Sequence, residues 1–284
     1  MSISFCHIGG PSMASYRYRC LMPAKELGAQ INNPKADILI FSKPDRQDIP
    51  HAMKAKEEKR KVIVDVCDMH FDLDHYKVMI KLADEVVCPT EWFKEFLKED
   101  FGVEAHVIGD PYEFPEVLPH CNGVNLLWFG HGINFGSLQR VGHQIMDFPL
   151  KIVSNIDGAV PYSFENLSRE FSQADIVLMP ETAPYKSANR TIEAIRQGCF
   201  VVAEPHPAIN HFPIYIGNIR KGIEWAKQNP QKANEMTAEA QSFIKKEYSP
   251  QTLGNAWRKV IRKAQSSFTL DAGISDGLVG LALM

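Results

Sequence analysis

Several features that define other classes of protein are missing from this sequence of 284 residues. No segment approaches the roughly 18 consecutive apolar residues that a membrane-spanning helix requires. The first residues lack the basic segment followed by an apolar one that is typical of a secretory signal peptide. With 45% apolar and 23% charged residues, the composition is that of a soluble globular protein, and we expect it in the cytoplasm.

Neither the charge nor the cysteines indicate a special partner. The formal net charge of −3 gives no general attraction to nucleic acid. No two cysteines form a Cys-x-x-Cys pair and there is no His-Glu-x-x-His motif, so we expect neither a disulfide framework nor a zinc site. We interpret the six cysteines as buried thiols: Cys6, Cys20, Cys67, Cys88, Cys121 and Cys199.

Short apolar runs alternate with helical patterns over most of the chain. Continuous apolar strands separated by helices indicate parallel sheets that are covered on both faces. The segment 110–119, "DPYEFPEVLP", holds three prolines and divides the runs into two series. The sequence therefore predicts an α/β protein with two doubly wound, Rossmann-like domains facing each other across a cleft. The expected strands lie at 3–8, 36–41, 61–67, 83–89 and 104–109, and then at 124–130, 150–155, 174–180 and 200–205.

These patterns divide the chain into four parts. We expect an amino-terminal domain over 1–118 and a second domain over 119–250. A last helix should follow over 251–267. The remaining residues, 268–284, contain glycines and show no periodicity, so we leave their structure open between disorder and an oligomer contact.

The segment "PYKSANRTIEAIRQGCFVVAEP" (184–205) carries the strongest functional signal. Lys186 and Arg190 stand at the start of a predicted helix, where free N–H groups also attract anions, so this region could bind a diphosphate. Ser187 or Asn189 could cap the first turn, and Glu193 could accept hydrogen bonds from ribose hydroxyls. The alternative is a solvated amphipathic helix with a surface pair between Arg190 and Glu193.

A second candidate loop, "GHGINFG" (130–136), follows a predicted strand. Its glycines would let the backbone approach a phosphate or a sugar closely, with Gly130 and His131 nearest the strand end. An ordinary turn between a strand and a helix explains the same residues. The spacing is not Gly-x-Gly-x-x-Gly, which disfavours a nicotinamide-dependent oxidoreductase.

The first domain offers its own polar group after its first strand. In "GGPSMASYRYRCLMP" (9–23), the residues Gly10, Ser15, Arg17 and Arg19 surround the start of a helix. Two arginines near a cleft can clamp a phosphate or an anionic acceptor, although surface arginines on a capped helix are the alternative. Pro23 should kink or restart this helix.

The segment "DVCDMHFDLDH" (65–75) allows two interpretations. Asp68 and His70 could be polar or acid–base groups at a strand end, and Asp72 or Asp74 could cap the helix that follows. In the other interpretation, Asp72 and Asp74 form an Asp-x-Asp metal site. We favour capping.

Taken together, these segments resemble those of a small GT-B glycosyltransferase of the large retaining families that use nucleotide sugars. The segments that carry the resemblance are "SYRYRCLMPAKELG", "ADEVVCPTEWFKEFLKEDFG", "LLWFG" and "ADIVLMPETAPYKSANRTIEAIRQGCFVVAEP". The resemblance implies that Glu193 binds the donor ribose, that Lys186, Asn189 and Arg190 face the diphosphate, and that Gly130 begins a loop facing the donor. It also implies that the helix around Trp257 crosses back to the first domain.

One position departs from the pattern of these families. Many relatives carry a second glutamate eight residues before the ribose-binding one, and Tyr185 occupies that position here. Glu181 is the earlier carboxylate that could take over a contact to the donor sugar.

We therefore expect a hexosyl- or pentosyltransferase that uses a UDP- or GDP-sugar and needs neither a metal nor a permanently bound cofactor. The acceptor would be a hydroxyl of a glycan or a lipid-linked glycan, or a nucleic-acid base. One alternative is a metal-dependent GT-A transferase, which would have a single mixed sheet and use Asp72 and Asp74. Another is a non-catalytic, two-lobed module that binds a nucleotide or a sugar.

Overall fold

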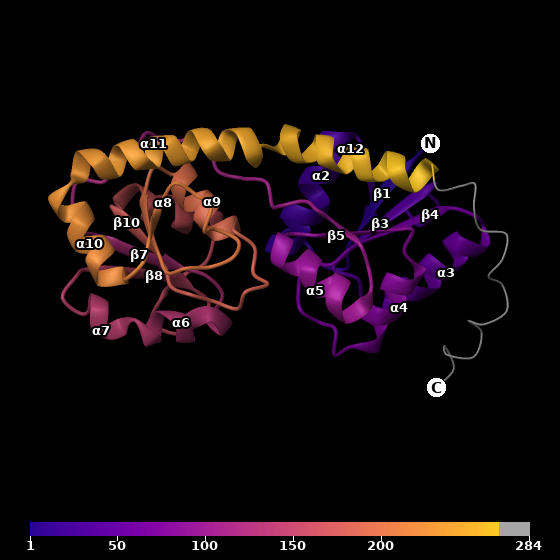
Figure 1. Cartoon of the computed structure of the whole chain (residues 1–284), viewed down its shortest axis with the longest axis horizontal. Coiled ribbons are helices and arrows are strands. Elements are labelled where there is room, and N and C mark those ends of the chain that lie inside the picture. The colour runs from indigo at the N-terminus through magenta and orange to yellow at the C-terminus, as the bar shows by residue number, and fades with distance from the viewer. Residues whose placement is uncertain (267–284) are drawn as a thin grey trace.

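The computed structural model describes residues 1–266 and shows two α/β domains side by side (Figure 1). The segment 268–284, which we left open, lies outside the described residues together with residue 267. Each domain contains a six-stranded sheet in which all pairings are parallel. The fold class predicted from the sequence is confirmed, and the single mixed sheet of the GT-A alternative is wrong.

The first sheet has the strand order β2-β1-β3-β4-β5-β6, so the chain reverses direction across the sheet between β1 and β3. In register, Phe5 of β1 lies beside Ile40 of β3. All five residues of β3 are buried, because helices cover both faces. The strands are β1 Ile3–Cys6, β2 Gln30–Ile31, β3 Ile38–Ser42, β4 Lys61–Asp65, β5 Glu85–Cys88 and β6 Ala105–Val107.

Helix α5 of the first domain begins and ends at residues that its local chemistry favours. In α5, the Thr90 side chain caps the first turn by accepting a hydrogen bond from the Phe93 N–H, and Gly102 ends the helix in a left-handed conformation with φ of 65°. The α-helices are α1 Ala14–Tyr16, α2 Met22–Leu27, α3 Ile49–Glu57, α4 Asp74–Leu82 and α5 Glu91–Phe101, with a 3₁₀ turn η2 at Arg46–Asp48.

Pro23 disturbs the helix after β1, as predicted. A π-helical turn, η1 Arg17–Leu21, lies between α1 and α2, just before the proline. Proline lacks the N–H that a regular helix would use, and π turns relieve such local conflicts. The turn buries Tyr18 and Arg19, and both residues line the cavity between the domains that is described below.

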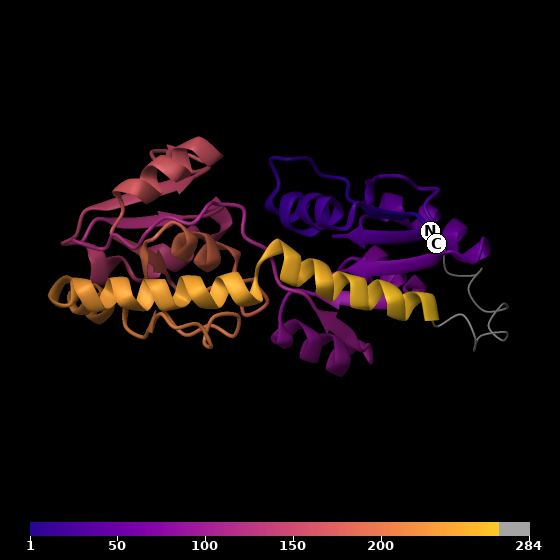
Figure 2. The same ribbon diagram turned by 90° about the horizontal axis from the view of Figure 1, so that it is seen from above.

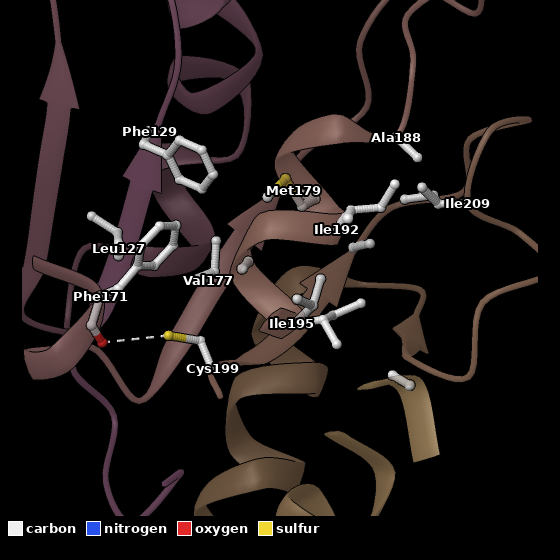
Figure 3. Packing of buried hydrophobic residues seen from close by; sticks show 14 of the residues in the cluster. Leu127, Phe129, Phe171, Val177, Met179, Ala188, Ile192, Ile195, Cys199 and Ile209 are labelled. Atoms are coloured by element: carbon white, nitrogen blue, oxygen red, sulfur yellow. Dashed lines mark hydrogen bonds between the residues drawn. The ribbon is translucent and has the colours of Figure 1, made fainter. Parts of the chain in front are cut away.

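The second sheet has the order β12-β11-β10-β7-β8-β9, with its reversal between β7 and β10. Figure 3 shows its packed core, where Ile192 and Ile195 of α9 lie over Val177 and Met179 of β10, beside Phe171 of α8. The strands are β7 Leu126–Phe129, β8 Leu150–Ser154, β9 Val160–Pro161, β10 Ile176–Met179, β11 Phe200–Ala203 and β12 Tyr215–Ile216. The helices are η3 Gly132–Asn134, α6 Phe135–Arg140, α7 Gly142–Ile145, α8 Phe164–Gln173, α9 Asn189–Arg196, α10 Ile219–Gln228 and α11 Pro230–Glu247.

The last helix, α12 Pro250–Ser266, continues along the top of the molecule from α11 and lies on the first domain (Figures 1 and 2). Trp257 is buried there with its ring edge-on to Phe5 at 5.2 Å between centroids. The chain thus passes between the domains twice, and the two passages touch, because Tyr248 packs against Gly109. The exact domain limits at 118, 250 and 267 stay a prediction.

The proline-rich linker is tied to the second domain. Phe114 is buried in that domain's core and stacks on Phe164 with ring centroids 4.1 Å apart. The Gln197 side chain donates a hydrogen bond to the Pro115 carbonyl, and the Val117 N–H donates to the Arg196 carbonyl. The end of α9 therefore holds the linker in place.

All six cysteines are free thiols, and five of them are buried. Within residues 1–266, no helix is long and apolar enough to cross a membrane.

Gly198, which follows α9, should be needed for this attachment of the linker. It adopts a left-handed conformation with φ of 77°, and a Cβ atom there would lie 2.4 Å from the Leu118 carbonyl oxygen. We expect Gly198→Ala to lower the free energy of unfolding by about 1–3 kcal/mol in urea titrations. Gly142→Ala is the control, since nothing lies within 4 Å of a Cβ at that position. Equal stability of the two variants would contradict this account of the linker.

Candidate functional site

A cavity of about 590 Å³ lies between the two domains and is lined by residues of both. It sits where the strand order of each sheet reverses, which is the place where open parallel sheets bind ligands. From the first domain, the segments after β1 and β3 contribute Ser15 and Lys43, and the segment after β4 contributes Asp68. From the second, Gly130 follows β7 and Arg190 lies in the first turn of α9.

The amino-terminal end of α9 opens into this cavity without a side-chain cap. Ala188 occupies the capping position, and Ser187 and Asn189 line the cavity. The predicted cap by Ser187 or Asn189 is wrong, because the Asn189 Oδ1 atom instead accepts from the N–H of the next residue, Arg190, at 2.7 Å. The other N–H groups of the first turn and the partial positive charge of the helix start favour an anion.

Arg190 adds a full positive charge at the same place. Its Nη1 atom donates to the Phe129 carbonyl at 3.0 Å, and its guanidinium lies 5.9 Å from the centre of the Trp128 ring. Burial lowers the pKa of Arg190 to about 10, so the group stays protonated at neutral pH. Among residues 1–266 no carboxylate forms an ion pair with it, and the surface pair with Glu193 that we considered is absent.

Gly130 makes the position of Arg190 possible. A Cβ atom on Gly130 would lie 3.0 Å from the Arg190 Nη1 atom, so a larger residue would push the guanidinium away. Next to it, His131 lines the cavity and is held by two contacts: its Nδ1 atom receives the Ile133 N–H at 3.3 Å, and its Nε2 atom lies 3.2 Å from the Asn155 amide nitrogen.

Lys186 and Asp68 meet across the cavity from opposite domains. The Lys186 Nζ atom lies 3.4 Å from one oxygen of Asp68, and the Nζ atom of Lys43 lies 2.7 Å from the other. Burial alone would raise the pKa of Asp68, but the two ammonium groups outweigh it and hold that pKa below its ordinary value. Asp68 is therefore ionised at neutral pH and cannot act as a general acid there.

Glu193 is buried and joins three parts of the chain. Its Oε1 atom accepts from the Tyr18 hydroxyl at 2.9 Å and from the Glu113 N–H at 2.6 Å, and its Oε2 atom accepts from the Phe114 N–H at 3.1 Å. Burial raises its pKa to about 7 although these donors act in the opposite direction. The carboxyl group thus links the first domain, the linker and α9, and it also lines the cavity.

The two arginines predicted for the acceptor side both line the cavity, but each is already paired. Arg19 is buried and makes a two-pronged ion pair with Asp65, with contacts of 2.5 and 2.9 Å, and also lies 3.3 Å from Asp110. Arg17 donates to Glu113 at 2.7 Å and to the Tyr162 hydroxyl at 3.2 Å. Both arginines hold structure together, and neither guanidinium lacks a partner.

Ser15 lines the cavity beside a histidine that sequence reasoning missed. The His7 Nδ1 atom accepts from the Gly9 N–H at 2.8 Å, so its Nε2 atom carries the proton and donates to the Ser15 hydroxyl at 3.2 Å. Burial, with a smaller effect of Lys43, lowers the pKa of His7 to about 4, so the ring is neutral. In the sequence, the two glycines that follow in "HIGG" were the only sign near His7 of a loop after the first strand.

Three predicted residues lie outside the cavity lining. Glu181 is exposed and interacts with Arg140 at 4.0 Å. The His70 ring lies edge-on to Tyr76 at 5.5 Å between centroids. Gly10 has open space where a Cβ would stand.

Asp72 and Asp74 are exposed, and neither caps α4, because Leu73 occupies the capping position and Asp74 is the first helical residue. The capping that we favoured is therefore wrong. No group of three or more His, Cys, Asp or Glu side chains within the described part of the chain is arranged to hold a metal ion.

No protein-family profile matches the sequence, and no curated protein matches it. Solved structures do match. HepE of Anabaena, determined with UDP, is 13% identical and superimposes with a TM-score of 0.71 over 92% of this chain and 100% of HepE. HepE was also determined with UDP-glucose and with UDP and glucose.

Two further structures share the arrangement less closely. TarM is 14% identical, with a TM-score of 0.61 over 78% of this chain and 54% of TarM. A protein of Listeria monocytogenes, whose name gives it as a UDP-N-acetylglucosamine 2-epimerase, is 10% identical, with a TM-score of 0.56 over 94% of this chain. At these identities the likeness shows the fold. The chain has the GT-B fold of two Rossmann-like domains.

The raised pKa of Glu193 should make stability depend on pH. The folded carboxyl keeps its proton up to about pH 7, whereas the ordinary pKa of 4.5 applies once the chain unfolds. Between these values the folded state binds more protons, so its contribution to stability is complete below pH 4.5 and is lost as pH rises toward and through 7. We expect Glu193→Gln to remove this fall in the free energy of unfolding, measured by urea titration at pH 5 and pH 8.

Glu239→Gln, on the exposed side of α11, is the control for that experiment and should keep the pH dependence of the unmodified protein. A Glu193→Gln variant with the same pH dependence as the control would contradict the assignment.

Proposed function

We propose that this protein is a glycosyltransferase that moves a sugar from a UDP-sugar to an acceptor hydroxyl. The observation that carries the proposal is the charge of Arg190, which has no carboxylate partner within residues 1–266 and stands at the uncapped start of α9 in the cavity between the domains. Burying a charge without a counter-ion is unfavourable, so this place favours an anionic ligand.

The diphosphate of a nucleotide sugar fits this charge. When the sugar leaves, negative charge builds up on the diphosphate, and fixed positive groups nearby lower the energy of that transition state. Arg190 and the N–H groups of α9 supply such groups, and Lys186 lies on the same loop. In this proposal Asn189 also faces the diphosphate, and Gly130 and His131 form the opposite edge of its site.

UDP is the nucleotide we propose, because the structures of HepE in complex with UDP and UDP-glucose share this fold over nearly the whole chain. We propose a hexosyl donor, and the UDP-glucose complex of HepE supports this choice. We assign Glu193 to the ribose. Three of its acceptor positions are taken, and a carboxyl group offers about four. The remaining position can accept from a ribose hydroxyl, or donate to it while the carboxyl group carries its proton.

The first domain contributes Asp68 to the reaction in this proposal. Its carboxylate lines the cavity opposite the diphosphate site and is ionised, so it can stabilise the positive charge that develops on the sugar ring during transfer. His70, our other catalytic candidate, lies against Tyr76 outside the cavity lining and receives no role.

The acceptor should enter from the side of Ser15 and Arg17. We propose a glycan or a lipid-linked glycan, and a variant of S. aureus TarM was solved with UDP and alpha-GlcNAc-glycerol. Neither the structure nor the comparisons support a nucleic-acid acceptor.

Binding of UDP to variants of Arg190 tests the proposal. A ligand present at about a hundred times its dissociation constant stabilises the folded state by about 2.7 kcal/mol, which raises the melting temperature visibly. We expect UDP to do so, and Arg190→Met to weaken binding by about 10- to 100-fold, as loss of hydrogen bonds to a charged ligand does. Isothermal titration calorimetry measures the affinity.

Arg220→Met is the matched control. Arg220 is also an arginine on a helix of the second domain, but it pairs with Asp147 and Glu224 outside the cavity. UDP should bind this variant as it binds the unmodified protein, with or without a chelator. Absence of UDP binding, or equal losses in the two variants, would refute the proposed site. UDP binding without turnover of UDP-glucose would instead favour the non-catalytic module.

A further inference from the structure

Lys43 lines the cavity, although no sequence pattern marked it. It follows β3 and has φ of 53°, a left-handed conformation that residues other than glycine rarely adopt. Its N–H donates to the Asp65 carbonyl at 2.9 Å, which helps to hold this conformation. The side chain is half-buried and reaches Asp68 at 2.7 Å, so this strained backbone conformation places an ammonium group beside that carboxylate.

Asp68 therefore lies between two lysines of opposite domains. Lys43 holds one carboxylate oxygen at 2.7 Å, and Lys186 approaches the other at 3.4 Å. Lys186 has a second neighbour, since its Nζ atom lies 4.8 Å from the centre of the Tyr185 ring. Lys186 also stands three residues before the start of α9, on the loop that leads to Arg190 and the proposed diphosphate site. One cation is thus positioned between a resident carboxylate and an anion-binding site.

From this geometry we propose that Asp68 is an internal counter-ion that competes with the diphosphate for Lys186, and that Lys43 limits this competition by holding Asp68 on the first domain. The inference rests on the proposed function and adds that Asp68 sets how tightly the donor binds. An incoming diphosphate must draw Lys186 away from Asp68. Lys43 keeps Asp68 paired after Lys186 has left, so the carboxylate does not remain in the cavity without a partner.

This arrangement predicts that substitutions of Asp68 and of Lys186, although they break the same ion pair, change the affinity for UDP in opposite directions. Removing Asp68 frees Lys186 for the ligand, so Asp68→Asn should tighten the binding of UDP. Removing Lys186 should weaken it. A partly exposed ion pair contributes up to about 1 kcal/mol, so the tightening should be about three- to fivefold. A role of Asp68 in holding the fold or the ligand would give weaker binding instead.

Lys43 completes the test. With Lys43→Met, Asp68 has only Lys186 as partner and holds it more firmly, so UDP should bind about two- to threefold more weakly. If Lys43 acts through Asp68, the same substitution should have no effect once Asp68 is replaced by Asn. If Lys43 binds the diphosphate itself, it should weaken binding in both backgrounds.

The experiment is a calorimetric double-mutant cycle over Asp68→Asn, Lys43→Met and Lys186→Met in the full chain, with UDP and inorganic pyrophosphate as separate probes. Asp147→Asn, which removes a carboxylate paired with Arg220 on the surface, is the control for net charge. Tighter binding of both probes by Asp68→Asn, lost when Lys186→Met is added, supports the inference. The melting temperature of each variant without ligand shows that it is folded.

The outcomes separate the inference from the proposed function. If the unmodified protein binds neither probe, both are overturned. If it binds UDP but Asp68→Asn leaves the affinity unchanged, lowers it, or raises it no more than Asp147→Asn does, the inference alone is overturned. A Lys43→Met effect that persists in the Asp68→Asn background overturns the part assigned to Lys43.

Discussion

The structure depends on one electrostatic constraint, the positive charge of Arg190 at the uncapped start of α9. Charges that are taken out of water are normally paired with an opposite charge, but among residues 1–266 this half-buried guanidinium contacts only the Phe129 carbonyl and the Trp128 ring. The surrounding residues maintain this arrangement: Gly130 leaves the space, and the core under α9 fixes the helix. A ligand with concentrated negative charge would satisfy the helix start and the side chain together.

The other end of the same helix keeps the domains in place. Glu193, one turn further along α9, receives hydrogen bonds from Tyr18 of the first domain and from two N–H groups of the linker. The last residues of α9 and Gly198 hold the rest of the linker, and α12 returns to the first domain beside it. The helix that would bind the donor is therefore also the element through which the two domains are joined.

Much of the fold could be predicted from the sequence, because buried parallel strands appear as apolar runs such as "ILIF" and the proline-rich segment separated the two series. Strands of two residues, such as β2 and β12, carry too little signal to be recognised. The site was predicted less completely. Lys186, Arg190 and Glu193 were found because they are close in sequence, on one helix and the loop just before it. Lys43 was missed because its partner, Asp68, follows a different strand. His7 was missed because it falls inside the predicted strand 3–8, and only the fold of the following turn brings Ser15 beside it. Glu181 was chosen by its spacing alone, and the loop points it into solvent.

The central claim is that the charge at the start of α9 belongs to a diphosphate. The most direct measurement is the affinity of the unmodified protein for UDP compared with uridine, by calorimetry under identical conditions. The account predicts that UDP binds about a hundredfold more tightly or better, because only UDP carries the groups that form charge-assisted hydrogen bonds with Arg190 and α9. Equal affinities for the two ligands, or no binding of either, would contradict it.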